Sequence, residues 1–397
     1  MSIAALVRSS TQAGIAAAAP NRPSRRVCKL DPTAAKRIEV TNLHQLARTI
    51  CLRTGWQGRV SDEQDLTALW AAVFDEHGQV ADGEGMLGRD FIRQEYDEVV
   101  DAMGIDSEEE YPTVARTGRS RLSRQQRRQL CTWFQAFNRL LQKRNLLTFE
   151  GTVHQARLIV ERGGFPRYRH VLVDELQDFG LEGLRLIAAL SQNDEDASNP
   201  LCVFGDGHQR INRQAKIPLS RAGINVVGRS RRLKINYRTS EQIRRWAHSL
   251  LNGMDIDDLD GGHADTTGDR SVFRASEPVA VTAPTFEKAA TAIADWVKGL
   301  RDNQGLGAHE ICVTPAFGEV RSALKALEIP TVELQANKAD PGPVEPGVRL
   351  GAMRRIKGLE FKAMAMVIEG QSDDRRRLER YVAAMRARQW LLVVECG

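Results

Sequence analysis

Three acidic side chains and a glutamine follow a short apolar run in the stretch HVLVDELQDFG, residues 170–180. A carboxylate at the end of a buried strand can hold Mg²⁺ directly or through water, and a neighbouring carboxylate can orient or deprotonate an attacking water. Asp174 and Glu175 are the two candidates for these roles. An Asp–Glu pair is a weak signal by itself, because an acidic strand end that caps a helix has the same composition.

The elements that must position these acids follow from the apolar pattern. Amphipathic helical patterns dominate between about residues 42 and 161, for example over 62–78 and 123–144. Short β-rich runs then alternate with helices, at residues 170–173, 201–204, 232–235, 311–314, 330–334, 348–353, 364–368 and 390–394. This alternation predicts an α/β fold with parallel sheets covered on both faces, in which ligands bind at the carboxyl ends of the strands.

Composition sets the broad class. A chain of 397 residues with a net charge of +5 is long enough for two domains and is not basic enough, as a whole, to indicate nucleic acid. The six cysteines have no metal-ligand spacing, so we expect free thiols in a reducing cytoplasm. No apolar run approaches about 18 residues, so no membrane span is expected. Two acid-free arginine runs, at 116–128 and 229–238, favour either a nucleic-acid contact or a solvated surface.

The full VDELQD segment resembles the Walker B segment of UvrD/Rep-type superfamily 1 helicases. The resemblance implies that Asp174 holds Mg²⁺, that Glu175 activates water and that Gln177 lies near the nucleotide. The next segment, LCVFGDGHQRI, resembles the family's following motif. It implies a nucleotide contact for Asp206 and a γ-phosphate sensor at Gln209.

Further segments follow in the family's order. RLKINYRTSEQI is similar to the segment that opens the second motor domain, which implies adenine stacking by Tyr237 and a γ-phosphate contact by Arg238. MRRIKGLEF resembles the KGLEF segment and implies nucleotide contacts from Gly358 and Glu360. YVAAMRARQWLLVV resembles the segment that carries a second arginine finger, here Arg386.

The resemblance also implies a DNA path and cofactors. His44 in IEVTNLHQLA, together with Arg354 and Lys357, is expected to contact nucleic acid. The implied cofactors are ATP and Mg²⁺, and the implied partner is single-stranded or partially duplex DNA. A protein partner that supplies missing elements is left open.

The implied fold is two RecA-like parallel-sheet domains with a helical insertion. The expected divisions are a disordered or remnant tail at 1–37, a first motor domain at 38–232 with the insertion at about 55–147, and a second motor domain at 233–397. Because a P-loop NTPase needs GxxxxGK[ST] and this sequence contains no Gly-Lys dipeptide, the first domain is expected to be incomplete and truncated at its N-terminus.

Two functional hypotheses therefore remain. The resemblance implies an ATP-driven 3′ to 5′ DNA translocase or helicase, impaired in ATP hydrolysis as the chain stands. The alternative is a catalytically silent relative that binds nucleic acid or is a gene remnant. A nuclease that uses the same acids is a third and weaker alternative.

Overall fold

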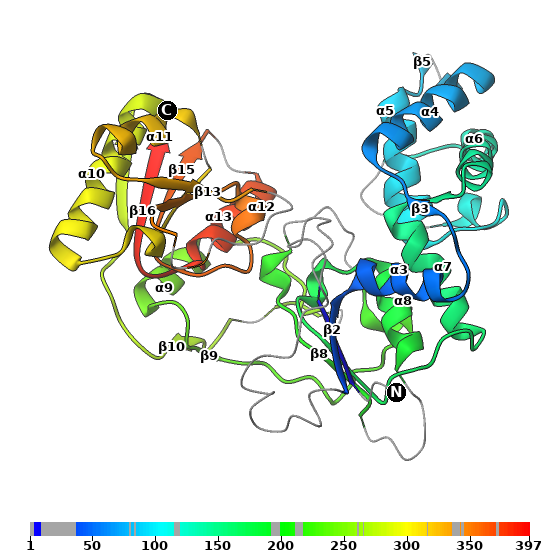
Figure 1. Ribbon diagram of the computed structural model, residues 1–397, viewed down its shortest axis with the longest axis horizontal. Helices are drawn as coiled ribbons and strands as arrows, with labels where there is room; N and C mark the ends of the chain where they lie inside the picture. Colours follow the sequence, from blue (N-terminus) through cyan, green and yellow to red (C-terminus); the bar gives the residue numbers. More distant parts are fainter. Residues whose placement is uncertain are drawn as a thin grey trace. The chain divides into compact units, whose positions relative to one another are not determined.

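The computed structural model describes residues 4–8, 37–78, 81–82, 85–114, 120–191, 199–210, 217–259, 262–264, 266–315, 317–335, 342, 345–370 and 373–397. These residues form two compact units (Figure 1). The first unit holds the described residues up to Gly205 and residues 217–226, and the second holds Asp206–Arg210 and the described residues from Val227 onward. The chain therefore contributes the short segment Asp206–Arg210 to the second unit, returns to the first unit at residues 217–226 and continues in the second unit from Val227.

The first unit is built on a four-stranded parallel sheet in the order β2-β1-β7-β8. The strands are β1 (Ala4–Arg8), β2 (Ile38–Asn42), β7 (His170–Val173) and β8 (Leu201–Val203). Strand β1 pairs with β2 on one side and with β7 on the other. A disordered or remnant tail was predicted for residues 1–37, whereas residues 4–8 form strand β1 of this sheet.

Three helices pack side by side in this unit, with α7 (Phe149–Glu161) between α3 (Leu43–Arg53) and α8 (Leu181–Leu190). A short 3₁₀ turn, η4 (Leu176–Asp178), joins β7 to α8, and η6 (Leu219–Ala222) also packs on α8. The apolar faces of α7 and α8 are buried, which is the pattern expected when amphipathic helices cover a sheet.

A helical insertion lies between α3 and α7. Its main helices are α4 (Glu63–His77), α5 (Arg89–Glu95) and α6 (Arg124–Lys143), and α5 continues into a π-helix, η2 (Tyr96–Asp101). Short elements complete it: η3 (Tyr111–Thr113), the pair β3 (Arg59–Val60) and β6 (Leu146–Leu147), and the hairpin β4 (Ala81–Asp82) and β5 (Gly85–Met86). Capping boxes at Asp62 and Ser123 start α4 and α6. The insertion has its own aromatic core, in which Trp70 stacks on Phe137 with ring centroids 4.2 Å apart.

The second unit is built on a six-stranded parallel sheet in the order β11-β16-β15-β12-β14-β13. The strands are β11 (Val279–Ala283), β12 (Ile311–Thr314), β13 (Thr331–Glu333), β14 (Val348–Leu350), β15 (Phe361–Glu369) and β16 (Ala387–Cys396). A separate two-stranded ribbon pairs β9 (Ile235–Asn236) with β10 (Arg270–Ser271).

Both faces of this sheet are buried. In β15, Ala363 and Ala365 face the core that includes α10 (Phe286–Gln304) and α11 (Gly318–Ala326). Met364 and Met366 face the opposite core, which includes α9 (Glu241–Ser249) and α13 (Asp374–Ala384). Two short helical turns, η7 (Ala308–Glu310) and α12 (Met353–Ile356), complete the unit. The prediction of an α/β fold with parallel sheets is confirmed, and burial of both faces holds for the sheet of the second unit, whereas Leu172 and Cys202 in the first sheet are exposed.

The predicted division after residue 232 differs from the observed contacts. Residues 227–232 and the turn η5 (Gly207–Gln209) belong to the second unit. The five cysteines among the described residues are free thiols, and Cys28 lies outside the described residues. None of the helices in the described ranges is long and apolar enough to cross a membrane.

Candidate functional site

The carboxylates of the first unit lie at the end of β7. Val171 and Val173 are fully buried in the sheet, and the chain turns directly after them. The backbone of Phe204 accepts from the Leu176 amide at 2.9 Å and donates to the Val173 carbonyl at 2.8 Å, so β8 holds both sides of this turn. Asp174 and its neighbours therefore leave the sheet at its carboxyl edge, as expected.

Glu175 has a left-handed backbone conformation, with φ 56° and ψ 44°. A non-glycine residue in this region costs about 1–2 kcal/mol and is enriched at functional sites. The Glu175 amide donates to Asp174 Oδ1 at 3.0 Å, and Gln177 Nε2 donates to Glu175 Oε2 at 2.5 Å. The first unit thus brings the predicted residues Asp174, Glu175 and Gln177 together in one short turn.

The predicted sensor Gln209 lies in η5 and belongs to the second unit. Its side-chain Nε2 donates to Asp206 Oδ2 at 3.0 Å, while its Oε1 accepts from Arg386 Nη2 at 2.6 Å. Lys357 Nζ donates to the Gln209 carbonyl at 3.0 Å. Four predicted residues, Asp206, Gln209, Lys357 and Arg386, therefore form one hydrogen-bonded group, which we call the Gln209 cluster.

Within the Gln209 cluster, Arg386 and Lys357 are buried, whereas Asp206 and Gln209 are half-buried. Arg386 is 1% exposed, and its Nε also donates to the Val382 carbonyl at 3.1 Å. Burial raises the pKa of Asp206, but hydrogen bonds from His208 and Gln209 lower it more, so its net pKa lies below the ordinary value. Asp206 is therefore a carboxylate at neutral pH, and it fixes which end of the Gln209 amide faces Arg386.

Lys357 was expected to contact nucleic acid, but it is only 2% exposed. Its placement favours holding the Gln209 segment in position over binding a phosphate directly. The side chain of Arg354, the neighbouring candidate, lies outside the described residues.

A second pair of predicted residues meets elsewhere in the second unit. Arg238 Nε and Glu360 Oε1 lie 2.5 Å apart, and both side chains are about two-fifths exposed. Tyr237, next to Arg238, is 70% exposed. Gly358 has φ 83°, a value that favours glycine in the turn before Glu360. This Arg–Glu pair is exposed enough to be weak and easily exchanged for a ligand.

His44 lies in the first unit, at the start of α3 and thus at the carboxyl end of β2. Strand β1 separates β2 from β7, so His44 shares an edge of the sheet with Asp174. Its ring packs edge-on against Phe149 at 5.4 Å, and its Nε2 lies 3.8 Å from Glu150 Oε1. The structure does not bring His44 into the turn that holds Asp174 and Glu175.

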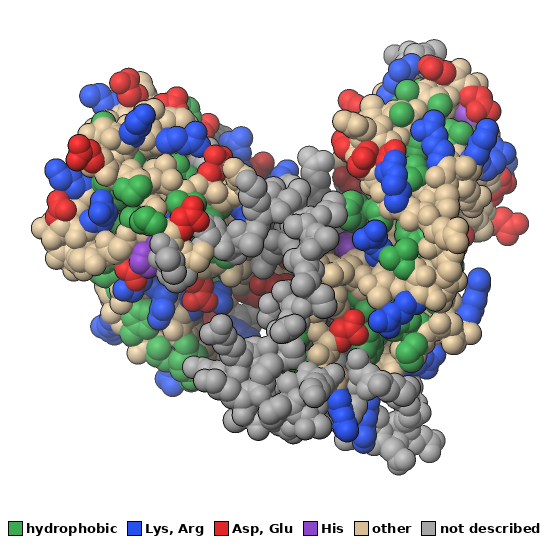
Figure 2. Space-filling view, viewed as in Figure 1, with side chains coloured by type: hydrophobic (Ala, Val, Ile, Leu, Met, Phe, Trp, Pro, Cys, Tyr) green, Lys and Arg blue, Asp and Glu red, His purple; other side chains and the backbone are tan. Residues whose placement is uncertain are grey.

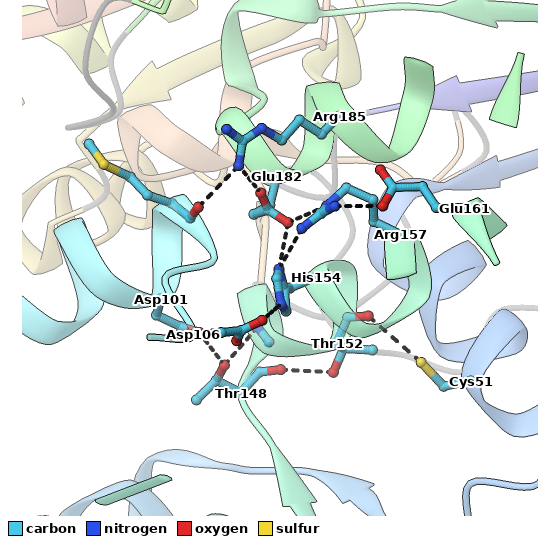
Figure 3. Close-up of polar contacts among 12 residues, drawn as sticks. Cys51, Asp101, Asp106, Thr148, Thr152, His154, Arg157, Glu161, Glu182 and Arg185 are labelled. Carbon is cyan, nitrogen blue, oxygen red and sulfur yellow. Dashed lines mark hydrogen bonds and ion pairs between the residues drawn. The ribbon is translucent and has the colours of Figure 1, made fainter. Parts of the chain in front are cut away.

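Sequence reasoning missed a buried ionic network in the first unit (Figure 3). Glu182 on α8, whose side chain is fully buried, accepts from His154 Nδ1 at 2.7 Å, from Arg157 Nε at 2.8 Å and from Arg185 Nη1 at 2.8 Å. His154 Nε2 lies 2.7 Å from Asp106 Oδ2 in the insertion. The network therefore ties α7, α8 and the insertion together. A glutamate on the otherwise apolar face of residues 181–190 was the available signal.

The pKa values in this network agree with the geometry. Burial lowers the pKa of His154, but the hydrogen bonds with Asp106 and Glu182 raise it more, to about 9. Burial raises the pKa of Glu182, but hydrogen bonds from His154, Arg157 and Arg185 lower it to about 2. At neutral pH the network is therefore an imidazolium and a carboxylate, with both ring nitrogens of His154 donating.

Comparisons with known proteins add the following. A model of the UvrD/REP helicase N-terminal domain matches residues 17–218, just over half of the chain. DNA helicase IV of Escherichia coli (strain K12) is 32% identical over 121 residues, which cover 29% of this chain and 17% of helicase IV. The chain thus spans about a sixth of that relative's length.

The chain also resembles solved structures. One of them is the C-terminal domain of a possible DNA helicase from Lactobacillus plantarum WCFS1, with 21% identity and a TM-score of 0.31. The match covers 41% of this chain and 88% of that domain. A likeness this low carries no argument about function.

Proposed function

Because this chain belongs to the UvrD/REP helicase family, we propose that it acts on single-stranded or partially duplex DNA as a helicase-type protein whose ATP hydrolysis is impaired in the chain as it stands. The observation that carries this proposal is the Gln209 cluster. Gln209 meets Lys357 and Arg386 although they lie 148 and 177 positions away in the sequence. These are the segments whose order resembles the helicase motifs.

The residues fit Mg²⁺ better than they fit a triphosphate. Asp174 and Glu175 present carboxylate oxygens, the ligands that Mg²⁺ prefers. A nucleotide also needs a loop of backbone N–H groups and a lysine that neutralises the phosphates. The sequence after β1, SSTQAGIA, contains no lysine, and no Gly-Lys dipeptide occurs in the chain. We therefore propose ATP and Mg²⁺ as cofactors from the family alone.

The proposed DNA contacts are sequence-independent. On the face shown in Figure 2, basic and acidic side chains are interspersed over each unit instead of gathering in a single basic field. Binding would then depend on a limited number of phosphate contacts and on stacking, with the salt dependence that such contacts impose. The direction of movement proposed from the resemblance is 3′ to 5′.

A catalytically silent relative remains the second candidate, and two contacts favour it. Arg386 already donates to Gln209, and Arg238 is already paired with Glu360. Both proposed arginine fingers thus have side-chain partners within the second unit, and a nucleotide would have to replace these partners.

The test combines DNA binding with ATP hydrolysis by the full chain, by Glu175→Gln and by Glu76→Gln. Glu76 is an exposed acid on α4 and serves as the control. We expect saturable binding of single-stranded DNA that weakens as salt rises. We also expect ATP hydrolysis to be no faster in the unchanged chain than in Glu175→Gln.

The outcomes separate the two parts of the proposal. DNA-stimulated hydrolysis that Glu175→Gln abolishes and Glu76→Gln preserves would refute the impairment and leave the helicase assignment standing. Failure to bind DNA at low salt would refute the proposed function itself.

A further inference from the structure

A pocket of about 480 Å³ lies in the first unit, where the insertion meets α7. Its walls come from the end of η2 and the turn after it, from α6, and from β6 and the first turns of α7. Its volume falls in the range of sites that hold small organic molecules. Polar side chains line much of it: Asp101, Gln135, Asn138, Arg139, Thr148 and His154.

Along one wall of the pocket, the acidic and basic side chains are equal in number. His154 belongs to the buried network, in which three acids (Asp106, Glu161 and Glu182) are matched by three cations (His154, Arg157 and Arg185) through the contacts drawn in Figure 3. The charges of this network therefore sum to zero, and none of its cations, all of which the structure describes, forms an ion pair with Asp101, which lines the same pocket.

Among the residues that the structure describes, the Asp101 carboxylate accepts one hydrogen bond. Thr148 Oγ1 donates to Asp101 Oδ1 at 2.7 Å and itself accepts from the Gly151 amide at 2.8 Å, so its only proton goes to Asp101. Within the described residues, no arginine, lysine or histidine forms an ion pair with Asp101. A carboxylate can accept about four hydrogen bonds, so most of its capacity is unused. An unpaired carboxylate in a pocket is costly and is stabilised by a cation.

We propose that this pocket binds a small organic molecule through a guanidinium group that pairs with Asp101. Amide side chains from α6, Gln135, Asn138 and Gln142, can hydrogen-bond the remainder of the molecule. Arg139 also lines the pocket and repels a second positive charge. The ligand is therefore cationic at its guanidinium end and carries no net positive charge at the other end, as in free arginine.

Titration of Asp101 makes ligand binding at this site depend on pH. Burial, together with the negative charges of Glu150 and Asp97, raises the pKa of Asp101 to about 8, although the hydrogen bond from Thr148 and the charge of His154 act to lower it. The titratable groups around it are Tyr96 and Asp97 from η2, Asp106 after it, Arg139 from α6, and Glu150 and His154 from α7. A cation that pairs with Asp101 must displace its proton. Affinity therefore rises with pH up to about 8, and binding at pH 7 releases a proton.

Calorimetric titration of the full chain with L-arginine and with L-citrulline tests the proposal. Citrulline has nearly the same shape but carries a neutral urea group in place of the guanidinium. We expect one saturable site for arginine, with affinity about tenfold or more above that for citrulline. Titrations at pH 7 in two buffers of different ionisation enthalpy should show release of about one proton.

Two variants complete the experiment. Asp101→Asn resembles the protonated carboxyl, so it should fold and should lose the preference for arginine over citrulline. Asp90→Asn changes an exposed acid of the same insertion and should leave arginine binding unchanged. Equal binding of arginine and citrulline, no saturation by about 10 mM, or unchanged binding in Asp101→Asn would overturn the proposal. If Asp101→Asn did not fold, binding to the unchanged chain without proton release would overturn it equally.

Discussion

Replacing Glu182 by glutamine should destabilise the first unit through one buried charge. The difference between an ordinary pKa of 4.5 and a folded value of about 2 corresponds to about 3 kcal/mol at about 1.4 kcal/mol per pH unit. The substitution keeps the shape of the side chain but leaves His154, Arg157 and Arg185 without their shared counter-ion. Loss of one member of a buried ionic group typically costs about 3–5 kcal/mol, so the two magnitudes agree.

The effect should depend on pH in a defined direction. Because the folded pKa of Glu182 is lowered, its stabilisation is fully present above pH 4.5 and is lost as the pH falls toward 2. The gap between the unchanged chain and Glu182→Gln should therefore narrow from about 3 kcal/mol at pH 7 to about 1–2 kcal/mol at pH 3. The raised pKa of His154 describes the same contact from its other side and is not added.

Amide hydrogen exchange in α7 and α8 is the suitable measurement, because the two units need not unfold together. Glu161→Gln provides the control: Glu161 pairs with the same Arg157 at 2.8 Å, but its side chain is 46% exposed. We expect this variant to lose less than about 0.5 kcal/mol. Equal losses in the two variants, or a loss below about 1 kcal/mol in Glu182→Gln, would refute the reasoning.

Two further predictions concern packing and thiol reactivity. Gly207→Ala should destabilise the second unit by about 1–3 kcal/mol in a thermal unfolding measurement, because a Cβ at this position would overlap the backbone carbonyl of Asp257, a residue held by its ion pair with Arg210. Gly318→Ala is the control and should leave the stability unchanged, because a Cβ there meets open space. Equal effects of the two substitutions would contradict this account. In the native protein, the exposed Cys202 should react with a thiol reagent before Cys51 and Cys131, because these two are buried and burial raises their pKa values to about 11. Timed labelling followed by peptide mapping with mass spectrometry measures the three rates. Equal rates for the three cysteines would contradict the prediction.

Much of the fold could be predicted from the sequence because parallel strands buried on both faces are continuous apolar runs. The runs at 311–314 and 390–394 lie within such strands of the second unit. The run at 170–173 also forms a strand, although Leu172 on it is 37% exposed. Helices α4 and α6 follow from their period and their capping residues. Strand β1 was missed, because its short run AALVR owes its place to pairing with β2 and β7 and not to its own pattern.

The candidate site likewise has features that the sequence determined and features that only the tertiary structure decided. The sequence alone determined which residue types follow each strand, because Asp174 and Glu175 come at the end of a buried run whatever surrounds them. Only the tertiary structure decided that Arg386 would donate to Gln209 and that Lys357 would be buried behind it, because those contacts join segments far apart in the chain. It also decided that Glu182 would collect three cations, since a buried charge acquires its partners from packing and its pKa from those partners.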